Sequence, residues 1–116
     1  MSHKEQLSKS NIEKVEQLRA DLGIEFPQSD FRRIIELLIE HSGLSPDDLL
    51  ACLSVDTCFY ESYGSDGFPF NSIDYVDFLC NIEEVFDIDI DVVSRSSMDA
   101  LREIVKAIIK KRKEKQ

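Results

Sequence analysis

Ser72 is the residue of this chain best placed to take part in chemistry. It stands where an amphipathic helix is predicted to begin, because apolar residues recur after it at helical spacing. Acidic and amide side chains follow at a second helical spacing and form a polar stripe: Asp74, Asp77, Asn81 and Glu84. A serine in this position can also simply cap the helix by accepting a backbone N–H, a role that requires no further function.

The sequence does not supply the groups that turn a serine into a catalytic nucleophile. The chain has two histidines, His3 and His41, and no His–Asp relay is legible around either of them. No other pair of base and nucleophile stands out, so we expect a protein that is not an enzyme.

A metal site is not predicted. Asp87, Asp89 and Asp91 match the first three ligand positions of an EF-hand calcium loop, but Val92 and Met98 stand where that loop needs Gly and a bidentate Glu.

The cysteines are odd in number and lack CxxC spacing: Cys52, Cys58 and Cys80. We therefore expect each to be a reduced thiol buried in the core rather than part of a disulfide or a zinc site.

The elements that must position Ser72 are helices, and the pattern contains no convincing strand. Capping residues, glycines and apolar periodicity predict helices from a Ser10–Glu13 capping box to Gly23, from Asp30 to Gly43, over 46–52 after Ser45, from Asn71 or Ser72 to Phe86, and from a Ser96–Asp99 capping box through Ile109. Together they describe an all-α protein, a small irregular helical bundle.

One face of the Ser72 helix is predicted to lie in the core. Its members share the i, i+3, i+4 spacing: Tyr75, Phe78, Leu79, Ile82, Val85 and Phe86. The loop over 53–70 is rich in aromatic residues, so we expect it to pack on that core. Residues 87–95 connect this helix to the last one, with room for a short turn.

Charge is distributed unevenly along the chain. Residues 34–94 carry fourteen acids and no Lys or Arg, whereas residues 95–116 carry eight bases and three acids. The acidic block excludes a nucleic-acid surface there and favours basic protein partners or a surface that keeps the chain soluble and monomeric. Most of the late cations lie at the end of the last helix, where its dipole favours them.

Membrane insertion and secretion are not expected. No window approaches 18 consecutive apolar residues, and the residues at 1–6 lack the apolar run of a signal peptide. A cytoplasmic location is therefore the expectation.

The segment from Phe70 to Ile90 resembles the second helix of the acyl carrier protein family. Asn71-Ser72-Ile73 stands where the family has an Asp-Ser-Leu triplet, and Glu83-Glu84-Val85-Phe86 with Ile90 is similar to its Glu-Glu-x-Phe-x-x-x-Ile ending. The resemblance covers about residues 30–110. It implies a four-helix bundle of acyl-carrier type over 30–111, with an extra N-terminal helix in 1–29 and a basic tail at 112–116.

The resemblance also implies a function. Ser72 would carry covalent 4′-phosphopantetheine, making the chain a phosphoprotein whose arm holds an acyl or aminoacyl group as a thioester for lipid, polyketide or peptide biosynthesis. A helix N-terminus favours the phosphodiester anion. The implied partners are a phosphopantetheinyl transferase, a loading ligase and acyl-processing enzymes, whose basic patches would meet Asp74, Asp77 and Glu84.

Some alternatives remain open at the level of sequence. The chain can instead be a carrier-fold, acidic protein-interaction module without the prosthetic group. Phe68 and Phe70 either line the mouth of an acyl pocket or pack on the core. Residues 1–29 either pack on the bundle or contact a partner. Asn71, which replaces the family's Asp, removes a charge but can still cap the helix.

Overall fold

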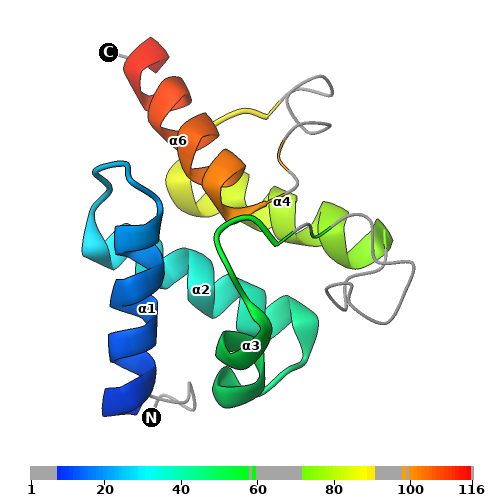
Figure 1. The fold of residues 1–116 in the computed structure, drawn as a ribbon. Coiled ribbons are helices and arrows are strands. Elements are labelled where there is room, and N and C mark those ends of the chain that lie inside the picture. The colour runs from blue at the N-terminus through cyan, green and yellow to red at the C-terminus, as the bar shows by residue number, and fades with distance from the viewer. Residues whose placement is uncertain (1–7, 58, 60–71, 91–97, 99, 116) are drawn as a thin grey trace, which may run out of the picture.

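The chain folds into helices only, as far as the structure describes it. The computed structural model describes residues 8–57, 59, 72–90, 98 and 100–115. This part contains five helices and no strand: α1 (Lys9–Asp21), α2 (Gln28–Ser42), α3 (Pro46–Cys52), α4 (Ser72–Phe86) and α6 (Leu101–Lys115) (Figure 1). The prediction of an all-α helical bundle is confirmed.

Two of the predicted helix starts need correction. Helix α1 is capped by Ser8, whose Oγ accepts the backbone N–H of Asn11, and not by Ser10. Helix α2 begins at Gln28 after Pro27, so Asp30 lies in the first turn and does not cap it. The carboxylate of Asp30 instead pairs with Arg112 of α6 at 2.8 Å.

Local signals predicted the junction between α2 and α3 correctly. Gly43 ends α2 with φ of 73°, a left-handed conformation that favours glycine. Ser45 then caps α3 through a hydrogen bond from the N–H of Asp48, and Pro46 occupies the first helical position.

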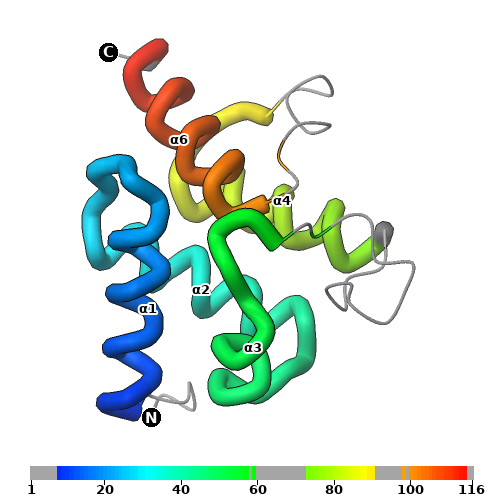
Figure 2. Tube along the Cα trace, in the orientation of Figure 1, coloured from blue at the N-terminus to red at the C-terminus, as the bar shows by residue number. Residues whose placement is uncertain are grey.

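All five helices contribute to one hydrophobic core. Helix α1 packs against α2 and α3, and α2 packs against α4 (Figure 2). Val15 and Leu18 of α1, and Leu22 directly after it, are buried in this core. The N-terminal helix is thus packed on the bundle, which was one of the two roles considered for residues 1–29.

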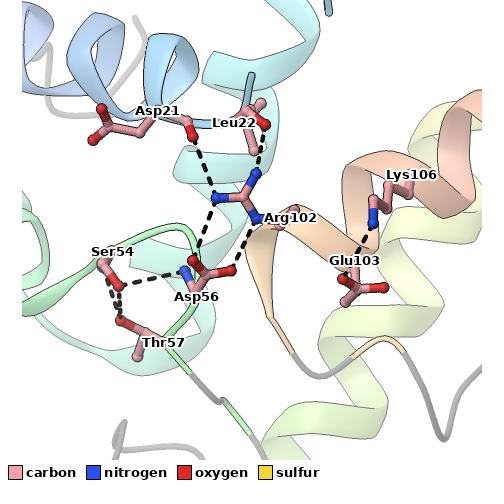
Figure 3. Close-up of polar contacts among 8 residues, drawn as sticks. All are labelled: Asp21, Leu22, Ser54, Asp56, Thr57, Arg102, Glu103 and Lys106. Atoms are coloured by element: carbon pink, nitrogen blue, oxygen red, sulfur yellow. Dashed lines mark hydrogen bonds and ion pairs between the residues drawn. The ribbon is translucent and has the colours of Figure 1, made fainter. Parts of the chain in front are cut away.

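Arg102 ties three parts of the chain together at the start of α6 (Figure 3). Its guanidinium donates to the carbonyls of Asp21 and Leu22 at the end of α1, and to the carboxylate of Asp56 at 2.9 Å. Its backbone N–H donates to Val55. The hydrogen bond from Arg102 lowers the pKa of Asp56, and the same bond raises the pKa of Arg102.

The expectation of buried cysteines is wrong for both that the structure describes. Cys52 and Cys80 are free thiols on the surface. Cys52 is the exposed last residue of the short helix α3, and Cys80 lies on the side of α4 away from the core. Cys58 lies outside the described residues.

Other predictions also fall outside the described residues: those for Ser96, Asp99, Phe68, Phe70 and most of the aromatic loop. Phe59, at the start of that loop, is fully buried. Helix α6 continues through Lys115, so most of the predicted basic tail is helical. Arg112 within it lies over the ring of Phe86, 5.4 Å from the centroid.

Candidate functional site

Ser72 is the first residue of α4, as the sequence predicts. The first backbone N–H groups of a helix have no partner within it, and the helix dipole makes this end positive. The next residue, Ile73, leaves 69% of its surface exposed. At Ile73 the first turn of α4 therefore faces solvent. Asn71 lies outside the described residues.

The inner face of α4 is fixed in the core by rings and one buried hydroxyl. Phe78 is fully buried, and its ring forms T-shaped contacts with the rings of His41 and Phe59 at centroid distances of 6.1 and 6.0 Å. The hydroxyl of Tyr75 donates to the carbonyl of Met98 at 2.7 Å. These contacts set the rotation of α4 about its axis and thereby decide which residues point outward.

A polar contact adds to this packing between α4 and α2. The side-chain amide of Asn81 lies 2.9 Å from Nε2 of His41 and also donates to the carbonyl of Asp77. Asn81, expected in the polar stripe, is thus committed to contacts within the molecule.

The core prediction for α4 needs one correction. Val85 is 36% exposed, because it lies at the edge of the buried face, just before Phe86. The other predicted core residues of the helix are buried.

The opposite side of α4 combines apolar and acidic side chains. We call it the outer face, and its exposed members recur at i, i+3, i+4, i+7 and i+11: Ile73, Val76, Asp77, Cys80 and Glu84. The structure places two of the three predicted partner-binding acids, Asp77 and Glu84, on this face. The third, Asp74, is half-buried at its flank.

The sequence analysis missed the two apolar members of the outer face. Ile73 and Val76 are 69% and 43% exposed. A signal for them was available, since both fall outside the spacing of the inner face that begins at Tyr75. Ile73 and Val76 lie one helical turn apart and together form a small exposed apolar patch beside the carboxylates.

The described residues can also be compared with the requirements of a metal site and of a membrane-spanning helix. Within them, no three His, Cys, Asp or Glu side chains gather closely enough to hold a metal ion. None of the helices in this part of the chain has the length and apolar character needed to span a membrane.

Comparison with known proteins identifies no relative: no family model, curated protein or solved structure matches the chain.

Proposed function

We propose that this chain is a carrier protein that bears 4′-phosphopantetheine on Ser72. The observation that carries the proposal is the position of Ser72 at the first residue of a 15-residue helix whose outer face is apolar and acidic. The resemblance of the segment around Ser72 to the acyl carrier protein family is the second support. When bound, the group supplies a thiol that holds an acyl or aminoacyl chain as a thioester.

The residues around Ser72 fit such a group. The phosphodiester is an anion, and the N-terminal amides and dipole of α4 favour an anion at this position. The exposed side chain of Ile73 leaves this end of the helix accessible to a modifying enzyme. Ser72 supplies only the hydroxyl that attacks the phosphorus of the donor in the transferase, where a phosphate leaving group departs; no group of this chain has to act on the cargo, since a carrier presents it to enzymes that do the chemistry.

The outer face would guide those enzymes. Asp77 and Glu84 would attract basic patches at long range, which raises the rate of association and makes it sensitive to salt. Ile73 and Val76 would add a small apolar contact close to the serine. Such a contact is weak, as a protein that visits several enzymes requires.

Co-expression with a phosphopantetheinyl transferase and intact-mass measurement test the proposal. The wild-type chain should gain the mass of one 4′-phosphopantetheine, and Ser72→Ala should gain nothing. Ser29→Ala is the matched control, because Ser29 is an exposed serine in the first turn of α2. No gain with transferases of several types, or a gain that persists in Ser72→Ala, contradicts the proposal.

A second candidate function keeps the outer face but not the prosthetic group. The exposed Ile73 and Val76 favour a protein-interaction module as well as a carrier. Capture of a partner that survives Ser72→Ala but is lost in Asp77→Lys/Glu84→Lys, together with no gain of mass, supports the module. Capture that depends on Ser72 supports the carrier.

A further inference from the structure

A groove beside α6 takes no part in the proposed function. It is formed by Ile24 of the α1–α2 connection together with residues of the C-terminal half of α6. Its volume is about 420 Å³, and we call it the α6 groove; it is lined by Ile24, Lys106, Ile109, Lys110, Lys113 and Glu114. Ile24 and Ile109 are half-buried and pack against the core.

The rim of the α6 groove is basic. Its lysines recur at i, i+4 and i+7 and share one side of the helix: Lys106, Lys110 and Lys113. Lys106 lies 3.8 Å from Glu103, whereas Lys110 and Lys113 form no ion pair with any residue the structure describes. Glu114 faces Lys111 at 3.7 Å, so its charge is largely matched. The groove therefore suits an occupant with apolar side chains flanked by carboxylates.

The chain itself carries a surface of that description. On the outer face of α4, Ile73 and Val76 are exposed one helical turn apart. Asp77 and Glu84 continue the same face and are both exposed. Ile24 of the α1–α2 connection and Ile109 of α6, rimmed by lysines, thus match two apolar residues followed by carboxylates on α4.

We propose that the α6 groove binds the outer face of α4 of a second copy of this chain. The Ser72 end of α4 and the C-terminal half of α6 lie at opposite sides of the molecule (Figure 1). One molecule therefore cannot bring its own two surfaces together, but two molecules can. The contact is head-to-tail, so it leaves a free groove at one end and a free α4 at the other, and association continues with concentration.

The distribution of charge selects a second copy over an anionic membrane as the occupant. The whole chain has a net charge of −9, which repels an anionic surface. Residues 34–94, which include α4, contain no Lys or Arg at all. Head-to-tail pairing places the basic part of one molecule against the acidic part of the next, which permits self-association despite the net charge. The pairing is an alternative to the monomer that the acidic block of the sequence favours.

This pairing does not involve the chemistry of Ser72. It covers the outer face of α4, and thus competes with any enzyme that docks there. At high protein concentration, other copies would therefore cover the outer face of α4 in a fraction of the molecules. The contact is weak and depends on salt, because its charges lie on the surface.

Sedimentation velocity of the full chain over a range of concentrations tests the proposal. At low salt the wild-type protein should associate, and high salt should lower the association constant about tenfold or more. Lys110→Glu/Lys113→Glu should be monomeric, and so should Asp77→Lys/Glu84→Lys. Lys9→Glu/Lys14→Glu on the exposed side of α1 is the matched control and should associate like wild type.

Mixing the two charge-reversed variants gives the sharpest result. The native acidic α4 of Lys110→Glu/Lys113→Glu can bind the native basic groove of Asp77→Lys/Glu84→Lys. The basic α4 of the second variant can likewise bind the acidic groove of the first. The mixture should therefore associate although neither variant does so alone. Ser72→Ala should associate like wild type, which separates this proposal from the carrier function.

Three outcomes overturn the pairing. The first is a wild-type chain that stays monomeric at every concentration and salt. The second is a mixture of the two variants that does not associate. The third is binding of vesicles of phosphatidylcholine and phosphatidylserine that is lost in Lys110→Glu/Lys113→Glu while no self-association occurs, since the groove then serves a lipid surface.

Discussion

Helices α2 and α4 have the same length of 15 residues and pack against each other, yet their outward sides differ. The outward residues of α2 are polar, and two of them, Arg33 and Glu36, form an ion pair at 3.2 Å. The outward residues of α4 include Ile73 and Val76. The exposed residues of α2 are thus polar, whereas those of α4 mix apolar and acidic side chains.

The inner faces of the two helices are closely alike. Ile34, Ile35 and Leu38 of α2 are fully buried, as are Phe78, Leu79 and Ile82 of α4. Both helices thus follow the same rule for building the core, and the difference is confined to the side that faces solvent. A difference of this kind is what the docking role proposed for α4 requires.

The largest effect is expected when an inner face is cut back. Phe78→Ala should lower the free energy of unfolding by about 3–5 kcal/mol, because the ring is fully buried between His41 and Phe59. Ile35→Ala in α2 should cost about 2–5 kcal/mol for the same reason. Urea denaturation measures both values. A cost below about 1 kcal/mol for either variant would show that the two inner faces are not equivalent.

Local sequence signals were enough to predict most of this fold. Gly43 ends α2 because it adopts a left-handed backbone conformation, which depends on that residue alone. Ser45 and Pro46 start α3 through contacts within one turn. The periodicity after Ser72 predicted the start of α4 and nearly all of its inner face. Val85 was wrong because a position at the edge of a face is decided by what packs beside it.

The contacts that sequence reasoning could not predict are long-range. Asp30 resembles a helix cap, but its partner Arg112 is 82 residues away in the chain. Arg102 meets Leu22 across 80 residues, and no local pattern marks that pairing. Cys80 is a small apolar residue that is typical of cores, and only the rotation of α4 puts it on the surface. The rotation of α4 about its axis likewise decides which apolar and acidic side chains the outer face exposes.

A second, smaller effect on stability sharpens the difference between the outward sides. Ile73→Ser/Val76→Ser should change the free energy of unfolding by no more than about 0.5 kcal/mol, because both side chains are exposed. It should still slow modification of Ser72 by a transferase roughly fivefold, equivalent to about 1 kcal/mol of binding. Intact-mass time courses measure the rate, and urea denaturation measures the stability.

The control for this variant lies on α2. Glu40→Ser changes an exposed residue on the outward side of that helix, so neither stability nor modification should move. A large loss of stability in Ile73→Ser/Val76→Ser would mean that the outer face of α4 belongs to the core. An unchanged rate of modification would remove its role in docking.

The smallest effect is expected outside the α2–α4 pair, at the exposed ion pair between Asp56 and Arg102. Arg102 holds the pKa of Asp56 below its ordinary value, so the folded protein keeps this carboxylate ionised to lower pH than the unfolded chain does. The pair therefore stabilises the fold at pH values above the ordinary aspartate pKa, and this contribution is lost as the pH falls through the lowered pKa. Asp56→Asn should be slightly less stable than wild type at pH 7, and the two should converge in acid. Urea denaturation at descending pH measures the gap, with Glu13→Gln, an exposed carboxylate without an ion pair among the described residues, as the control. If the difference in free energy of unfolding between Asp56→Asn and wild type stays constant with pH, Asp56 acts through its shape and not its charge. For Phe78→Ala that difference should be constant with pH, because no charge is involved.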